Sequence, residues 1–328
     1  MSQLTISEGK PAASEGRPLS AQTRRRLAGP ILLATDGTAQ SIGAFAATVA
    51  IAAGESRRAD RVQKTAVRVL TVSDALIVVP PEVVVALPRD YAEHHRSEQL
   101  AAAAEQLRQN VGDPDGWRVE VASGSPAQTI ADVADEMGAS LIVMGLGRHD
   151  VFDRVFGSET ALRVMRHAKT PVLAVPQNWI GIPRRVLVAV DFGPASLRAA
   201  RVALRIVAPG STVCFAHVAP KIGEPAFYGE LAAIYQASLN DEFDRFITAV
   251  GVPDDVSVER VAPFGDAART LLSWTRTHNI DMIVAGTHGL NRIARLFVGS
   301  VASKVIRGAQ CAVLVARALK SDTQRGDK

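Results

Sequence analysis

The chain has 328 residues, of which 47% are hydrophobic and 21% charged, so it is long enough for two domains and able to bury ordinary cores. The formal net charge of +4 lies at the two ends, because residues 1–28 carry +3 and residues 319–328 carry +1. The body between them is formally neutral, which argues against a nucleic-acid-binding domain, since phosphate contacts require positive charge.

Two cysteines, Cys214 and Cys311, exclude a disulfide framework and a cysteine-based zinc module, and they fit a reducing compartment such as the cytoplasm. Residues 1–28 are rich in Ser, Gly, Pro and charge and are predicted to be a disordered leader; residues 318–328 form a tail. The most apolar stretch, 77–87, is eleven residues long and contains prolines. It is too short to cross a bilayer, so no membrane span is expected.

Short apolar runs and amphipathic stretches alternate along the chain. The strands predicted in the first half are 31–35, 66–72, 117–122, 141–144 and 172–175, and the helices are 39–53, 90–110, 126–137 and 158–167. The strands predicted in the second half are 185–190, 212–218, 256–262, 281–285 and 312–315, and the helices are 195–207, 228–250, 266–278 and 300–307. This alternation predicts a parallel sheet covered on both faces in each half.

The two halves resemble each other in sequence. Four segments recur in the same order: 31–37 and 186–193, 140–145 and 281–286, 155–168 and 297–309, and 170–176 and 311–317. A repeat of this length indicates one duplicated domain rather than a solenoid. The predicted domains are therefore residues 29–176 and 184–317, joined by a linker at 177–183.

Ligands of such sheets bind beyond the carboxyl ends of the strands, where the strand order reverses. In the second half Asp191 follows the first strand, and Gly286-Thr-His-Gly289, nine residues and Gly299-Ser300 follow the fourth. Glycines permit backbone angles and close approach that a Cβ forbids. A loop that turns into a helix N-terminus presents free N–H groups to phosphate, and Ser300 is interpreted first as the cap of that helix.

The pattern G-x2-G-x9-G-[ST] after a strand, with an Asp after the first strand, resembles the ATP-binding signature of universal stress proteins. The strand VLVAVD, the pair His217-Val218 and the closing CAVLV are similar to that family too. The resemblance covers both halves. It implies a duplicated Rossmann-like, adenine nucleotide alpha hydrolase-like α/β/α fold, with a five-stranded parallel sheet of order 3-2-1-4-5 in each half.

Carried over by position, the resemblance implies that Asp191 contacts the ribose and that Val218 contacts the adenine through its backbone. The residues it assigns to the triphosphate are Gly286, Thr287, His288, Gly289, Leu290, Asn291, Arg292, Gly299, Ser300 and Val301. The implied ligand is ATP or a related adenine nucleotide, accompanied by Mg²⁺. Because family members pair through the last strand, the two halves are expected to form an intramolecular pseudo-dimer, and a homodimer is a further possibility.

The first half departs from this pattern. Its corresponding residues are Asp36, Gly145, Gly147, Gly157 and Ser158, with one residue fewer between the first two glycines. The nine-residue segment carries no net charge, against +2 in the second half, and Glu159 would compete with a phosphate for the helix N-terminus. The second half is therefore predicted to be the better nucleotide site, and the first to be weak or a scaffold.

Three functions stay open from the sequence: a nucleotide-binding stress protein, an interaction scaffold without nucleotide, and a slow ATP hydrolase. No residue is assigned as catalytic, because no clear general base lies beside the phosphate loop. His217 is interpreted as a packed core histidine. The apolar, Pro-rich residues 74–90 are expected to pack over the sheet, with a lid over Asp36 or a partner-binding patch as the alternatives.

Overall fold

The computed structural model describes residues 27, 29–57, 65–73, 91–112, 114, 116–147, 158–179, 181–220, 229–287 and 299–319. Its contacts divide the chain into two compact units, the N-terminal unit from Leu27 to Gly181 and the C-terminal unit from Ile182 onward. This division falls within the predicted linker. The expected leader apart from Leu27, the Pro-rich segment 74–90 and most of the tail lie outside the described residues.

The N-terminal unit alternates strands and helices as predicted, with a 3-10 turn at Ala39–Ser41 before the first helix. Its strands are β1 (Ile31–Ala34), β2 (Val67–Ser73), β3 (Trp117–Ser123), β4 (Leu141–Gly145) and β5 (Val172–Val175). Its helices are α1 (Ile42–Arg57), α2 (Tyr91–Asn110), α3 (Pro126–Glu136) and α4 (Ser158–His167).

The C-terminal unit repeats this order. Its strands are β6 (Arg185–Ala189), β7 (Thr212–Ala216), β8 (Ser257–Val261), β9 (Met282–Gly286) and β10 (Ala312–Ala316). Its helices are α5 (Pro194–Ile206), α6 (Gly229–Val250), α7 (Ala267–Thr277) and α8 (Ser300–Gly308).

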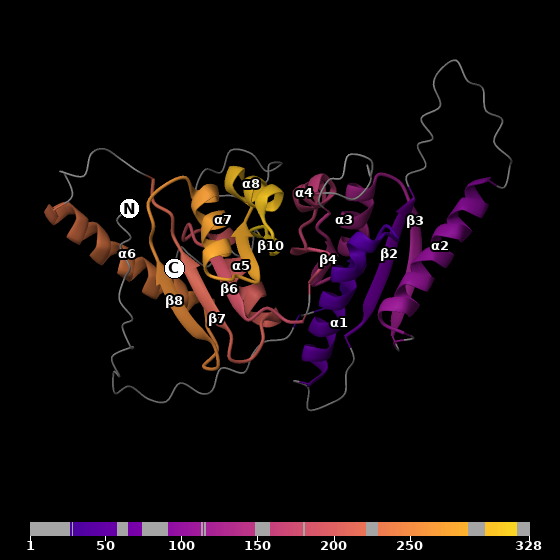
Figure 1. The fold of residues 1–328 in the computed structure, drawn as a ribbon, viewed down its shortest axis with the longest axis horizontal. Coiled ribbons are helices and arrows are strands. Elements are labelled where there is room, and N and C mark those ends of the chain that lie inside the picture. The colour runs from indigo at the N-terminus through magenta and orange to yellow at the C-terminus, as the bar shows by residue number, and fades with distance from the viewer. Residues whose placement is uncertain are drawn as a thin grey trace, which may run out of the picture. The chain divides into compact units, whose positions relative to one another are not determined.

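Within each unit all strand pairs are parallel, and the order is β3-β2-β1-β4-β5 in one and β8-β7-β6-β9-β10 in the other. Helices α1 and α2 pack together, as do α3 and α4, and the pairs α5–α6 and α7–α8 repeat this arrangement. Helices cover both faces of each sheet (Figure 1). The first two right-handed crossovers of a unit run in one direction across the sheet and the last two in the other, which places one helix pair on each face. The predicted Rossmann-like three-layer fold and its strand order are thus confirmed.

The central strands are buried on both faces, which explains why they read as continuous apolar runs rather than alternating ones. All four residues of β1 are buried, as are Val186, Leu187 and Val188 of β6. The edge strands β3 and β8 are more exposed and contain charged residues, among them Glu120 and Glu259. Charges on an edge strand discourage pairing with another chain.

Two predicted boundaries differ from the structure in ways that affect the site. β7 ends at Ala216, so His217 and Val218 follow the strand, although the His217 N–H still donates to the Val261 carbonyl at 3.0 Å. Ser300 is the first residue of α8 and Gly299 is its N-cap, with φ −51° and ψ 151° and no side-chain capping bond. The interpretation of Ser300 as the cap is therefore wrong, because its backbone is already helical. Ser158 likewise lies inside α4.

Candidate functional site at the carboxyl edges of the two sheets

The strand order reverses at the first strand of each unit. β6 pairs with β7 on one side and with β9 on the other, and β1 pairs with β2 and β4 in the same way. The residues that follow these three strands therefore meet at one edge of each sheet. In an open parallel sheet this is the position where a ligand binds.

Asp191 is half-buried directly beyond β6, and its carboxylate is held by the turn and helix that follow. Its Oδ1 accepts the Gly193 backbone N–H at 3.0 Å and the Ser196 hydroxyl at 2.6 Å. Ser196 lies in the first turn of α5 and is 1% exposed. Phe192, between the acid and the helix, has φ +59°, an unusual angle for a residue with a side chain.

Gly286, the last residue of β9, is in close contact with this same turn. A Cβ on Gly286 would lie 2.8 Å from the Ala195 carbonyl carbon and Cβ and from the Ser196 nitrogen. The close approach expected at Gly286 is thus present, but it is made to α5 of the protein itself. Gly286 does not have a positive φ, so the expectation of special backbone angles there is wrong.

The loop that follows β9 is closed at its base by backbone hydrogen bonds. Thr287 is 2% exposed, and its N–H donates to the Ala316 carbonyl at 3.0 Å. Its own carbonyl accepts the Gly299 N–H, which joins the two ends of segment 288–298. Ser300 and Val301 then begin α8, whose N-terminus has no side-chain cap. The segment itself, with His288, Gly289, Leu290, Asn291 and Arg292, lies outside the described residues.

Aromatic side chains pack between the turn that carries Asp191 and helix α6. The Phe192 ring lies 4.9 Å from the His217 ring and 5.2 Å from the Phe243 ring, measured between centroids. His217 is half-buried, and its Nδ1 lies 2.9 Å from the Val190 carbonyl. Since a carbonyl only accepts, Nδ1 carries the proton in this contact. Val218, assigned to the adenine, follows His217 and is half-buried.

The N-terminal unit builds the same arrangement from different residues. Asp36 Oδ1 accepts the Thr38 N–H at 3.0 Å, the Thr38 hydroxyl at 2.8 Å and the Ser41 hydroxyl at 3.0 Å. A Cβ on Gly145, at the end of β4, would lie 2.7 Å from the Gln40 carbonyl oxygen. Gly147 is buried after β4. The next segment, 148–157, which includes Gly157, lies outside the described residues, as does the side chain of Ser158.

In this unit polar side chains connect the turn that carries Asp36 to helix α2, in contrast to the aromatic packing against α6. The Thr35 hydroxyl donates to Gln106 Oε1 at 2.5 Å, and Gln106 Nε2 donates to the Thr38 carbonyl at 2.7 Å. Gln106 is 7% exposed, so these two bonds satisfy its buried amide. The acid-bearing turn is thus tied to the long helix by hydrogen bonds in one unit and by aromatic packing in the other.

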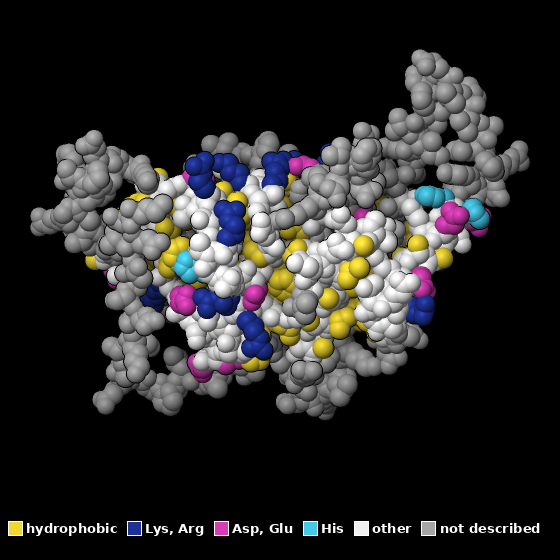
Figure 2. All heavy atoms as spheres, in the orientation of Figure 1, with side chains coloured by type: hydrophobic (Ala, Val, Ile, Leu, Met, Phe, Trp, Pro, Cys, Tyr) yellow, Lys and Arg dark blue, Asp and Glu magenta, His cyan; other side chains and the backbone are white. Residues whose placement is uncertain are grey.

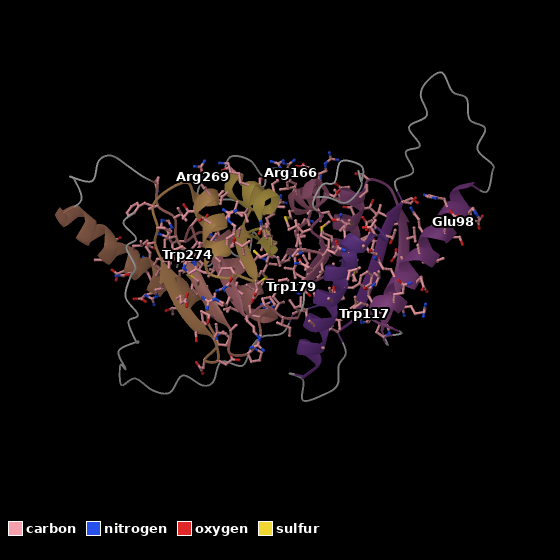
Figure 3. The ribbon with its side chains drawn as sticks, viewed as in Figure 1. Glu98, Trp117, Arg166, Trp179, Arg269 and Trp274 are labelled. Atoms are coloured by element: carbon pink, nitrogen blue, oxygen red, sulfur yellow. The ribbon has the colours of Figure 1, made fainter. Side chains whose placement is uncertain are left out.

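Helix α7 of the C-terminal unit and the corresponding helix α3 of the N-terminal unit expose side chains of opposite charge. Helix α7 exposes Arg269 and Arg276, whereas the matching α3 exposes Asp132, Asp135 and Glu136. Figure 2 shows Lys and Arg side chains over α7 and α8. Arg269 lies in the first turn of α7, toward the end where α8 begins (Figure 3). Arg269 is thus a positive side chain near this edge in the C-terminal unit, whereas the three acids of α3 lie in the second half of that helix, away from the edge.

In the part of the chain that the structure describes, no group of three or more His, Cys, Asp or Glu side chains is arranged to hold a metal ion. Among the same residues, no helix combines the length and apolarity that a bilayer crossing requires.

Two functional candidates were missed from the sequence, Ser41 and Ser196. A signal for both was present, because each serine stands five positions after the aspartate in its own half. Of the residues predicted for the second site, the structure brings Asp191, Val218, Gly286, Thr287 and the Gly299–Val301 helix start to one sheet edge. Whether they bind nucleotide stays a prediction.

Comparison with known proteins agrees with this architecture. The model of the universal stress protein family matches the chain twice, at residues 28–176 and 183–317. The solved universal stress protein of Archaeoglobus fulgidus DSM 4304 superposes with a TM-score of 0.60 at 20% identity, covering 91% of this chain and 100% of that one. At that identity the superposition supports the fold alone.

Curated relatives include universal stress proteins of Mycobacterium tuberculosis H37Rv. Rv2005c is 24% identical over 204 residues, which is 60% of this chain and 68% of the relative, and Rv1996 is 28% identical over 212 residues, covering 60% and 64%. The Sll1388 protein of Synechocystis is 29% identical over 101 residues, covering 28% of this chain and 66% of the relative. The chain thus matches about two thirds of the length of these relatives.

The fold and the repeated order of its elements define a tandem α/β protein of the Rossmann-like type. The chain belongs to the universal stress protein family, with two family domains in one polypeptide.

Proposed function

We propose that the protein binds an adenine nucleotide, ATP in the first place, mainly in its C-terminal unit, and that it acts in the stress response of the cytoplasm. The observation that carries the proposal is the pairing of a fixed carboxylate, Asp191, with the uncapped start of α8 at one sheet edge. A carboxylate suits ribose hydroxyls, and free N–H groups at a helix start suit phosphate.

The C-terminal unit is the stronger candidate on electrostatic grounds. Arg269 in the first turn of α7 and Lys304 in α8 add positive charge near the uncapped helix. Lys304 Nζ lies 3.4 Å from Asp266 Oδ2, so part of its charge is offset. The N-terminal unit keeps its carboxylate at Asp36 but has Glu159 in the first turn of α4. We expect this unit to bind nucleotide more weakly or to serve as a scaffold.

Mg²⁺ would enter with the nucleotide. This ion keeps several waters and is usually held by substrate phosphates plus one or two carboxylates, so a dedicated cluster of protein ligands is not required. Asp191 is the carboxylate that follows β6 at this sheet edge, and we assign it to the ribose rather than to the metal ion. The free cysteines Cys214 and Cys311 fit the proposed cytoplasmic location.

The test is an equilibrium titration of the full chain with labelled ATP and Mg²⁺. Asp191→Asn removes the charge but keeps the shape, and we expect it to weaken binding about tenfold or more, as for a hydrogen bond to a charged group. Asp254→Asn is the matched control, because Asp254 is an exposed acid that precedes β8 at the opposite sheet edge.

Retained binding in Asp254→Asn and its loss in Asp191→Asn would support the proposal. If the wild-type chain bound no nucleotide at millimolar concentration, the interaction scaffold would replace nucleotide binding as the function of this protein.

A further inference from the structure

The carboxylate that follows the first strand is held in the same manner in both units. Asp191 Oδ1 accepts two hydrogen bonds and Asp36 Oδ1 accepts three, all from the next five residues. Among the described residues, no hydrogen bond reaches Oδ2 of either aspartate. A carboxylate has about four acceptor sites, so each aspartate has one oxygen engaged by the protein and one left available.

A buried serine supplies the bond that links the carboxylate to the helix. Ser196 is 1% exposed and Ser41 is 3% exposed, so neither hydroxyl can turn to water instead. The Ser196 hydroxyl lies 2.6 Å from Asp191 Oδ1, a length typical of a charge-assisted O–H···O⁻ bond. The other contact of this hydroxyl, the Gly193 carbonyl at 3.0 Å, is longer. The single proton is therefore best assigned to the carboxylate.

The serine is in turn held in place by the neighbouring strand. A Cβ on Gly286 would meet the Ser196 nitrogen at 2.8 Å, and a Cβ on Gly145 would meet the Ser41 Cα at 3.4 Å. The absence of a side chain at these glycines lets the strand end contact the helix turn directly. The backbone of each serine is therefore packed directly against the end of the neighbouring strand.

We propose that Ser196 is a positioning residue that fixes the Asp191 carboxylate so that Oδ2 accepts a hydroxyl of the ligand's ribose, and that Ser41 does the same for Asp36. The inference rests on the proposed nucleotide binding and extends it, because it predicts discrimination between ribose and deoxyribose. Without Ser196, the Asp191 carboxylate keeps only the Gly193 N–H bond, so its orientation is less restricted and the ribose hydroxyl loses a firmly placed acceptor.

The experiment compares Ser196→Ala with wild type in titrations with ATP, 2′-deoxy-ATP and 3′-deoxy-ATP. Wild type is expected to bind ATP about tenfold more tightly than at least one deoxy form, because the deoxy form lacks a hydrogen bond to a charged acceptor. The measured quantity is the ratio of the two affinities. In Ser196→Ala this ratio is expected to fall to about two or less. A purely structural serine would weaken all three nucleotides equally and leave the ratio unchanged.

Ser211→Ala is the matched control. Ser211 is a fully buried serine of the same unit, but its hydroxyl has no hydrogen-bond partner and it precedes β7 at the opposite sheet edge. This variant is expected to keep the wild-type ratio. Should Ser196→Ala fail to fold, Ser196→Cys replaces the hydroxyl with a weak donor of similar size and is expected to lower the ratio too.

Failure of the positioning role and failure of nucleotide binding give different results in these titrations. If wild type binds ATP but Ser196→Ala keeps the wild-type ratio of ATP affinity to deoxy-ATP affinity, the positioning role is overturned and nucleotide binding stands. A wild-type chain that binds none of the three nucleotides overturns the proposed function, and the positioning role falls with it.

Discussion

Replacement of Gly286 by alanine tests the contact on which the geometry of the C-terminal site depends. The new Cβ would lie 2.8 Å from three atoms of Ala195 and Ser196, two of which are backbone atoms. That is about 0.7 Å shorter than the roughly 3.5 Å at which carbon atoms pack best. The clash cannot be relieved by rotation of a side chain, so the first turn of α5 must move away from β9.

We expect Gly286→Ala to lower the free energy of unfolding by about 2 to 3 kcal/mol, the upper part of the range for overpacked cores. The measurement is urea denaturation followed by circular dichroism, with the slope of the transition compared between variants. The same displacement moves Ser196 away from its 2.6 Å bond to Asp191. Nucleotide affinity should therefore fall even at temperatures where the variant is fully folded.

Gly308→Ala is the control in the same unit. A Cβ there would meet the Leu272 Cδ1 atom at 2.6 Å, which is the far end of a flexible side chain that can move. Gly308 does not have a positive φ, so alanine adds no backbone strain of the left-handed kind there. We expect this variant to lie within about 1 kcal/mol of wild type. If both variants lost the same free energy of unfolding, the explanation of the Gly286→Ala effect by a steric clash would be refuted.

Two further predictions follow from the titratable groups. Burial raises the pKa of the Cys214 thiol to about 12 and that of Cys311 to about 11, so both are protonated at pH 8. Neither should react with a thiol reagent until the protein unfolds; fast modification of the native chain would contradict this. The Arg269 backbone N–H, and secondarily Lys304, lowers the pKa of Asp266 at the start of α7. A lowered folded-state pKa contributes stability above the ordinary Asp pKa of about 3.9 that is lost as pH falls. Asp266→Ala should therefore be most destabilised relative to wild type near pH 7, with the gap narrowing below about pH 4 in pH-dependent denaturation; a gap independent of pH would show that the carboxylate charge is not involved.

Much of the architecture follows from local patterns in the sequence. Apolar runs such as 31–34 and 186–188 are buried strands because both faces of the central strands are covered. The predicted helix at 158–167 matches α4 residue for residue. The duplicated order of segments was sufficient to predict two similar sheets. Asp36 and Asp191 were found from their place after a strand, because parallel strands always present their carboxyl ends at one edge.

The helix cap at α8 could not be predicted from residue type. Serine is a strong N-cap residue and glycine a weaker one, yet Gly299 is the residue with extended angles and Ser300 is helical. The hydrogen bond from Gly299 to Thr287 sets this boundary. Its partner lies twelve positions earlier, outside the span on which capping preferences depend.

The sequence by itself determined the repeated α/β pattern, the parallel direction of the strands and the position of the two aspartates, whereas the strand order was implied by the family resemblance. These properties depend on the periodicity of apolar residues and on turns between neighbouring elements, which can be followed along the chain. Only the tertiary structure decided that Gly286 contacts Ser196 and that Gln106 holds the Asp36 turn. These contacts join residues 68 to 90 positions apart, and their geometry arises when helices dock on a completed sheet.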